Sequence, residues 1–211
     1  MKILKTIISG VLAGICIAIG GCASLSLDSK IAGGIFFTVG LFLVVTYGFK
    51  LYTGMVGNIV SEKKTYIFTA LLALIGNLIG AFSVGFLVRL TRLTPLIEKA
   101  EALAAAKFSD GFLSIFILAV FCNILIYFAV DTYKNNKHEL GKYLGLLLCV
   151  PVFIICSFDH CVANMFYLAA GNAYSLHSFF ALLIMILGNT VGGLIIPLCR
   201  LLLREKGETG N

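Results

Sequence analysis

Charged residues are scarce in this chain. Asp, Glu, Lys and Arg together make up 12% of its 211 residues, whereas 60% are hydrophobic. A soluble globular domain is about half apolar and about a quarter charged. A water-soluble domain of this size could not bury so much apolar surface. The composition therefore predicts an all-α protein whose solvent is the lipid bilayer, as a single domain over residues 1–211.

Several chemical signatures are absent as well. The seven cysteines include no Cys-x-x-Cys pair and lie in or beside apolar segments, so we expect neither a metal site nor a disulfide framework. No Gly-x-Ser-x-Gly turn is present, and nothing indicates a cofactor. The net charge of +6 is scattered between apolar segments, which argues against a nucleic-acid partner and favours the positive-inside rule.

The first 24 residues allow two interpretations. Lys2 and Lys5 precede an apolar run that ends in Gly20-Gly21-Cys22, a pattern that resembles a secretory or lipoprotein signal. The alternative is a first transmembrane helix that is retained. We favour the second interpretation, because the internal repeat described below needs this helix to complete its first half.

Six segments are long and apolar enough to be membrane spans, for which about 20 residues are needed. The second is interrupted by Tyr47-Gly48-Phe49-Lys50 and the fifth near Ser157-Phe158-Asp159-His160. The spans are predicted at 6–27, 31–60, 66–90, 109–131, 141–171 and 178–203.

The distribution of basic residues predicts the orientation. Six spans place both termini on one side, and that side holds ten basic residues against five on the other, which predicts cytoplasmic termini in the inner membrane. The ten are Lys2, Lys5, Lys63, Lys64, Lys134, Lys137, Lys142, Arg200, Arg204 and Lys206; the five are Lys30, Arg89, Arg92, Lys99 and Lys107.

An internal repeat relates two halves, roughly 1–105 and 106–211. Gly76-Asn77-Leu78-Ile79-Gly80 in the third span matches Gly188-Asn189-Thr190-Val191-Gly192 in the sixth, and an interrupted span precedes each motif. Three spans per half make this an inverted 3+3 repeat. The paired glycines are expected to let helices approach closely. Asn77 and Asn189 are expected to bind backbone groups freed where a neighbouring helix breaks.

The two interruptions also carry the candidate chemistry. Ionisable residues within a span are costly and mark functional sites, and irregular backbone at that depth is tolerated where it is buried in protein or lines a cavity. Two breaks from opposite halves would meet near the midplane, where transporters built from repeats place their substrate site.

The second interruption, Phe158-Asp159-His160-Cys161-Val162-Ala163-Asn164-Met165-Phe166, resembles the signature of the formate/nitrite transporter family. Leu51-Tyr52-Thr53-Gly54 resembles that family's loop in the second span, and Gly188-Asn189-x-x-Gly192-Gly193 resembles its motif in the last. The resemblance covers essentially the whole chain. It implies an aquaporin-like fold with broken second and fifth helices, a homopentamer with one pore per subunit, and passage of formate, nitrite, hydrosulfide or a similar anion.

The resemblance also implies roles for individual residues. His160 is the central pore histidine, Thr53 its partner from the first loop, and Lys107 the vestibule cation. Leu51 and Phe153 fall at constriction positions, and Tyr52 and Asn164 lie in the same pathway. Asp159, Asn77 and Asn189 are expected to support the backbone, with Asp159 bound to Lys50 or to freed amides. Lys50 departs from the family, which usually has an acid there; it is either a second anion attractor or a residue that extends toward the membrane surface.

These residues suggest a mechanism of permeation. A bare anion in an apolar pore loses its hydration at large cost. Lys107 would concentrate anions at the mouth, while Leu51 and Phe153 would exclude water. His160, with an unperturbed pKa of about 6.5, would either give the anion a proton or stabilise it by charge. Two other classes remain, an intramembrane enzyme using Ser157, His160 and Cys161, and a membrane scaffold subunit.

Overall fold

The computed structural model describes residues 1–203, and over this range the chain is helical with no strand. Five helices are long and apolar enough to cross a membrane: α1 (Lys2–Leu25), α2 (Lys30–Tyr47), α4 (Thr65–Val88), α6 (Phe112–Asn135) and α9 (Leu176–Leu203). Arg204 and Lys206, which contribute to the predicted orientation, lie outside the described residues.

The two spans predicted to be interrupted are each divided into separate helices. In the first, α2 ends at Tyr47, the chain is extended at Leu51, and α3 (Tyr52–Val56) and a 3-10 turn (Gly57–Val60) follow. In the second, α7 (Glu139–Ile155) gives way to α8 (Cys161–Ala170). Gly48 ends α2 with φ of 68°, a left-handed conformation that glycine adopts without a steric penalty.

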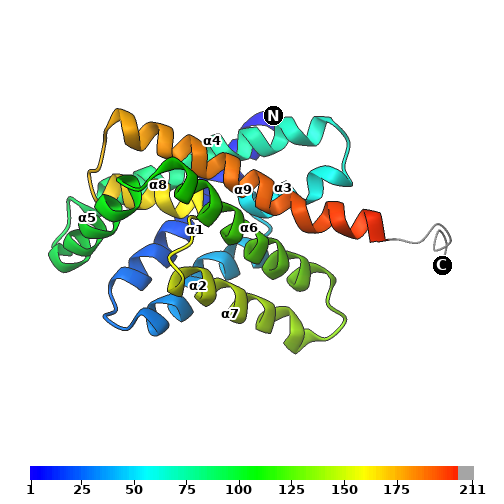
Figure 1. Cartoon of the computed structure of the whole chain (residues 1–211), viewed down its shortest axis with the longest axis horizontal. Helices are drawn as coiled ribbons and strands as arrows, with labels where there is room; N and C mark the ends of the chain where they lie inside the picture. The colour runs from blue at the N-terminus through cyan, green and yellow to red at the C-terminus, as the bar shows by residue number, and fades with distance from the viewer. Residues whose placement is uncertain (204–211) are drawn as a thin grey trace.

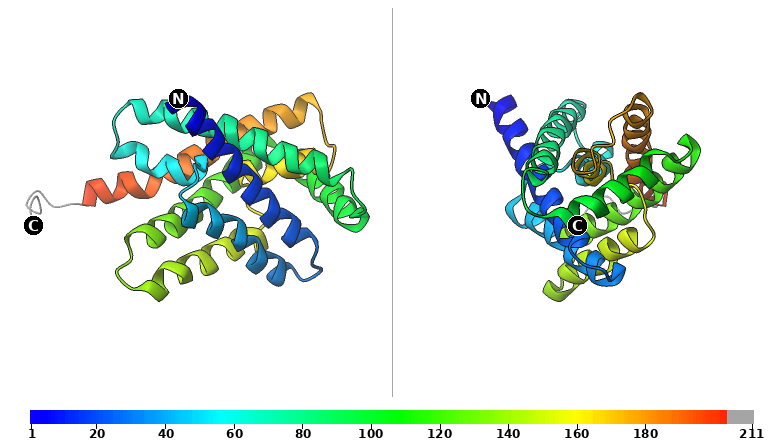
Figure 2. Two further views of the ribbon diagram at one scale, coloured as in Figure 1. Left: turned by 180° about the vertical axis from the view of Figure 1, so that it is seen from behind. Right: turned by 90° about the vertical axis from the view of Figure 1, so that its left-hand side faces the viewer.

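One helix was not predicted from the sequence. Residues assigned to the connection between the third and fourth spans form α5 (Thr94–Phe108), which lies at one end of the molecule, opposite the connection between α6 and α7 (Figures 1 and 2). Pro95 occupies its first turn, where proline is well tolerated. The helix contacts α8, and its buried residues recur every four positions: Leu96, Ala100, Ala104 and Phe108. Its mixture of charged and apolar residues does not have the composition of a membrane span, so no pattern in the sequence indicated it.

The long helices pack in two matching groups. In the first, α1 contacts α2 and α4; in the second, α6 contacts α7 and α9, and α2 joins the groups through α7. Gly80 of α4 lies so close to α1 that a Cβ would overlap the carbonyl oxygen of Val11, and Gly192 of α9 lies equally close to Val120 of α6. Small residues therefore let the helix backbones approach in each group.

Two buried asparagines hold the helix breaks in place. Asn77 of α4 accepts a hydrogen bond at Oδ1 from the Tyr52 N–H (2.8 Å), and its Nδ2 donates to the carbonyl oxygens of Lys50 and Gly10 (both 2.9 Å). One carboxamide thus joins α4 and α1 to both sides of the break between α2 and α3.

Asn189 of α9 makes the corresponding bonds at the second break. Its Oδ1 accepts from the Cys161 N–H (2.8 Å), and its Nδ2 donates to the carbonyl oxygens of Asp159 (2.8 Å) and Ala119 on α6 (2.7 Å). Backbone groups that a broken helix leaves open therefore find partners without water.

Replacing Asn189 by Ala tests this bracing. The change leaves the Cys161 N–H and the Asp159 carbonyl unpaired, each at a cost of about 1–3 kcal/mol, so we expect an apparent melting temperature in detergent lower by about 10 °C. Ser83→Ala is the matched control, because Ser83 is exposed and bonds only to the Ile79 carbonyl of its own helix. Equal melting temperatures for the two variants would show that Asn189 does not brace the break.

Candidate functional site

Thr53 and His160, which the sequence placed on different breaks, are in direct contact. Thr53 lies in the first turn of α3, and His160 caps the N-terminus of α8. Thr53 Oγ1 lies 3.0 Å from His160 Nε2, and the two residues are 1% and 2% exposed. The pair therefore links the two breaks in the interior of the molecule.

The capping bond determines which nitrogen of the neutral imidazole carries hydrogen. His160 Nδ1 accepts from the backbone N–H of Ala163 at 3.1 Å. Because an amide can only donate here, Nδ1 must offer its lone pair, and the hydrogen is on Nε2. Nε2–H then donates to Thr53 Oγ1, which leaves the hydrogen of the Thr53 hydroxyl available to another acceptor. Protonating Nδ1 would point its N–H at the N–H of Ala163, and the hydrogen bond that caps α8 would be lost.

Apolar side chains flank the Thr53–His160 pair. The Phe153 ring stacks on the His160 ring with centroids 5.8 Å apart, and it meets Phe37 edge to face at 5.4 Å. Leu51, buried at the N-cap of α3, precedes Thr53 by two residues. Together these groups form a dry surround for the imidazole.

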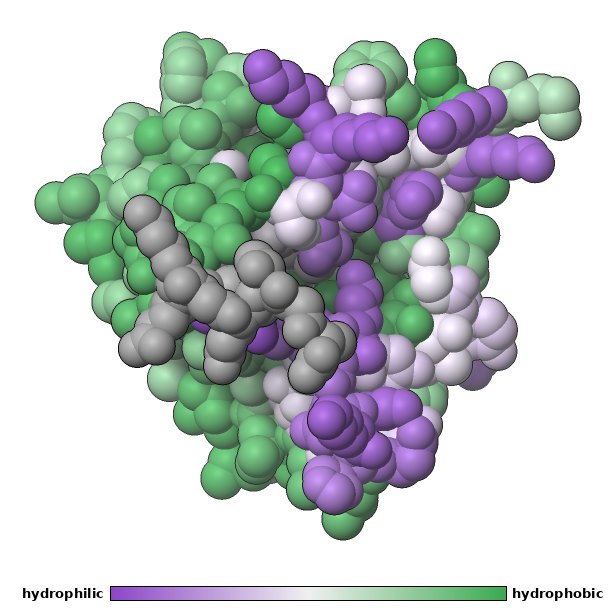
Figure 3. All heavy atoms as spheres, turned by 90° about the vertical axis from the view of Figure 1, so that its right-hand side faces the viewer, coloured by the Kyte–Doolittle hydropathy of each residue, from purple (hydrophilic) through white to green (hydrophobic). Residues whose placement is uncertain are grey.

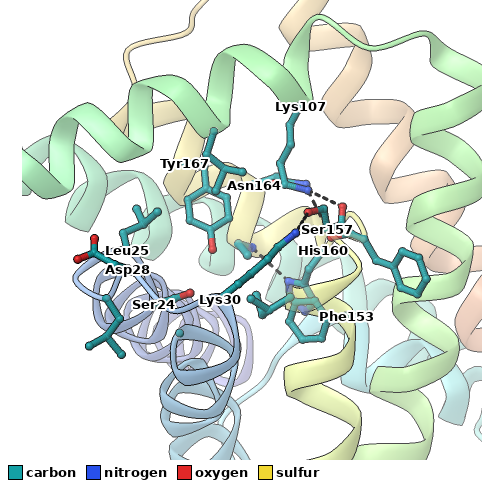
Figure 4. Close-up of a pocket in the computed structure, with 16 residues that line it drawn as sticks. Ser24, Leu25, Asp28, Lys30, Lys107, Phe153, Ser157, His160, Asn164 and Tyr167 are labelled. Atoms are coloured by element: carbon teal, nitrogen blue, oxygen red, sulfur yellow. Dashed lines mark hydrogen bonds between the residues drawn. The ribbon is translucent and has the colours of Figure 1, made fainter.

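A cavity of about 320 Å³, here called the α5 pocket, reaches His160 and Phe153 from the end of the molecule that carries α5. Figure 4 shows Lys30 extending across it from α2 and Lys107 descending into it from α5. Asn164 lines the same pocket. The structure thus brings four of the predicted pathway residues to one cavity.

Lys107 fastens the second break. Its Nζ donates to Asp159 Oδ1 (2.7 Å) and to the carbonyl oxygens of Ser157 (2.9 Å) and Phe158 (3.4 Å). Asn164 Nδ2 also donates to Asp159 Oδ1, at 3.0 Å. Asp159 was expected to bind Lys50 or freed backbone amides, and in the described part of the chain its side chain binds neither; its cationic partner is Lys107, which comes from a helix that the sequence did not reveal.

Lys30 was missed as a site residue. Its Nζ donates to Ser157 Oγ at 3.0 Å, and Ser157 has a left-handed φ of 57° in the middle of the break. The available signal was the charge distribution, which put Lys30 on the same face as Lys107. Asp28 also lines the α5 pocket. The hydrogen bond and charge of Lys99 hold the pKa of the Asp28 carboxyl below its usual range.

A second cavity of about 280 Å³, here called the Lys50 pocket, reaches Leu51 and Gly54. It shares no lining residue with the α5 pocket, and Lys50, Lys134 and Tyr66 are its ionisable lining residues. Its residues come from the break at α3 and from the ends of α2, α4 and α6 nearest the α6–α7 connection. Figure 3 looks onto that end and shows hydrophilic side chains gathered in a band between hydrophobic flanks.

Tyr52 lies differently from the other residues of its loop. Its hydroxyl is 2.7 Å from Thr190 Oγ1 of α9, and it lines neither pocket. This side chain ties α3 to α9. Residues 1–203 contain no cluster of three or more His, Cys, Asp or Glu of the kind that holds a metal ion.

Comparison with known proteins identifies relatives that are described as a transporter or as formate channels. The chain is 32% identical to the uncharacterized transporter YrhG of Bacillus subtilis (strain 168), over 79% of this chain and 68% of that protein. It is 29% identical to the formate channel BtFdhC of Bacillus thuringiensis, over 67% and 58%. It is 25% identical to the formate channel FocA of Haemophilus influenzae, over 77% and 65%. The last two matches span less than two thirds of the relative's length.

Solved structures agree with these relatives. A pentameric formate channel with formate bound superposes with a TM-score of 0.81 at 26% identity, covering 95% of this chain and 97% of that one. An ion channel of the same family, at 23% identity and a TM-score of 0.79, supports the fold alone. The family model described as formate/nitrite transporter matches residues 1–202. The chain is therefore a helical membrane protein that belongs to the formate/nitrite transporter family.

Proposed function

We propose that this protein is a channel for small monovalent anions, with formate, nitrite and hydrosulfide as candidate substrates. The observation that carries the proposal is the meeting of Thr53 and His160 between two pockets that approach from opposite ends and share no lining residue. The relatives described as formate channels supply the substrate class.

The proposed topology has six membrane crossings: α1, α2 with α3, α4, α6, α7 with α8, and α9. The halves 1–105 and 106–211 then form an inverted, aquaporin-like repeat, and the matching bonds of Asn77 and Asn189 support this relation. The excess of basic residues near the α6–α7 connection supports cytoplasmic termini in the inner membrane. The pentameric formate channel with a closely similar subunit supports a homopentamer.

In this mechanism, the two pockets hold hydrated anions. The barrier between them, formed by Leu51, Phe153 and the Thr53–His160 pair, admits one anion at a time. Lys30, and more weakly Lys107 because it is paired with Asp159, attract anions to the α5 pocket. Leu51 and Phe153 remove water from the anion, at a cost that hydrogen bonds must offset. Neutral His160 donates through Nε2–H, and the Thr53 hydroxyl can donate its own hydrogen when the imidazole turns to the substrate.

Two routes of charge compensation are compatible with this arrangement. The anion can take up a proton on its way to the barrier and cross as a neutral acid, or it can cross stabilised by the imidazole. Asn164 Oδ1 is buried without a hydrogen-bond partner within residues 1–203 and belongs to a residue of the α5 pocket. It is therefore suited to accept a hydrogen bond from the protonated acid.

The contacts of His160 argue against an intramembrane enzyme. One ring nitrogen contacts Thr53 and the other the Ala163 amide, while the Ser157 hydroxyl binds Lys30. A nucleophile–base pair is therefore not formed by Ser157 and His160 in this structure. A scaffold subunit would have no need for pockets that approach a buried histidine from both ends.

The proposal predicts formate flux that depends on the Thr53–His160 pair. Proteoliposomes with the wild-type protein should swell and acidify in a formate gradient. His160→Asn should lower the proton-accompanied flux more than tenfold, and Thr53→Val about tenfold, because a buried hydrogen bond contributes about 1–1.5 kcal/mol.

Thr69→Val is the matched control, because Thr69 is half-buried on α4, bonds only to the Thr65 carbonyl of its own helix and lines neither pocket. It should leave the flux unchanged. Wild-type vesicles that pass none of formate, nitrite and hydrosulfide, or a His160→Asn variant with unaltered flux, would refute the proposal.

A further inference from the structure

Two lysine side chains bring positive charge to the Lys50 pocket. Lys50 comes from the break between α2 and α3, and Lys134 from the last turn of α6. Within residues 1–203 neither ammonium group forms an ion pair, and no acidic side chain lines the pocket. Asp131, one turn before Lys134, is already bound to Arg200 (3.0 Å) and to Asn135 Nδ2 (2.8 Å).

The α5 pocket is different in this respect. Lys107 is neutralised by Asp159 at 2.7 Å, and Asp28 and Lys99 form another pair at its rim, at 2.6 Å. Lys30 also lines that pocket, and within the described chain it forms no ion pair with a carboxylate. The potential that attracts anions is therefore stronger at the Lys50 pocket, which carries two such cations.

We propose that the Lys50 pocket is an anion-binding site that loads a small monovalent carboxylate or oxyanion directly before Leu51. The inference rests on the proposed function and gives the channel a preferred loading side, the one that carries the α6–α7 connection. Lys50, whose role the sequence left open, is assigned as an anion attractor.

The pocket also offers a neutral donor and room for water. The Tyr66 hydroxyl accepts from Asn58 Nδ2 at 3.3 Å, so its own hydrogen remains free to reach an anion. A volume of about 280 Å³ exceeds that of a small anion, since a water molecule occupies about 30 Å³. The anion therefore waits here partly hydrated and sheds its water at Leu51.

The test compares formate flux from each face in planar bilayers with Lys50→Gln, Lys134→Gln and the double variant. The double variant should raise the half-saturating formate concentration about tenfold from the α6–α7 face and less than twofold from the α5 face. The difference should shrink at high ionic strength because salt screens exposed charge. Glutamine keeps the main-chain bonds of Lys50 to Ser9 and Asn77.

Lys137→Gln is the matched control. Lys137 is an exposed cation of the α6–α7 connection that lines none of the described pockets, so Lys137→Gln removes one positive charge from the same face, as each single variant does. It should leave both half-saturating concentrations unchanged. A double variant that behaves like Lys137→Gln while the wild type conducts would overturn the inference and leave the proposed function standing.

A binding measurement separates the two failures. Carbon-13 formate should show line broadening with the purified wild-type protein and with Lys137→Gln, and much less with the double variant. If the wild type passes none of formate, nitrite and hydrosulfide from either face, the proposed function fails, and selective loss of broadening in the double variant still supports the site. Equal broadening for all proteins overturns it.

Discussion

Every backbone group in the lipid interior needs a hydrogen-bond partner inside the protein. A helix meets this requirement alone, but a broken helix does not. Asn77 and Asn189 supply what the two breaks lack, each with one acceptor and two donated hydrogen bonds. Because both side chains are buried on helices that pack by close glycine contacts, the breaks are held in fixed places. Thr53 and His160 meet for that reason.

The lysines nearest the two breaks are either paired with a carboxylate or line a pocket. Lys107 shows the first case, because its Nζ binds a carboxylate and two carbonyl oxygens of the second break. Lys50 and Lys134 show the second, since both line a pocket that reaches the end of the molecule. The buried stretch between the pockets contains a neutral imidazole and a hydroxyl. The proposed route therefore leads an anion from positive surroundings to a dry barrier with two hydrogen-bond donors.

Much of this arrangement was predictable from local sequence. Polar interruptions of apolar runs predicted where α2 and α7 end, and the Gly-Asn-x-x-Gly pattern singled out both asparagines. The family prediction is confirmed. The roles assigned to individual site residues stay predictions, although the structure brings Thr53, His160 and Phe153 together.

The features that the sequence did not reveal depend on contacts between distant segments. The mixed composition of α5 gave no apolar signal, so Lys107 was not foreseen as the partner of Asp159, for which Lys50 or freed amides were expected. Lys30 reaches Ser157 across 127 residues of sequence, and Tyr52 turns toward Thr190 on another helix. No local pattern specifies such pairings, because they follow from how the helices pack.

The most direct test of the account is thiol accessibility from each face. In a background without the seven native cysteines, Leu51→Cys and Phe153→Cys would be treated with a membrane-impermeant methanethiosulfonate in oriented vesicles. The account predicts that the first reacts only from the α6–α7 face and the second only from the α5 face. Reaction of both from the same face would contradict a barrier at Thr53 and His160 between two opposed pockets.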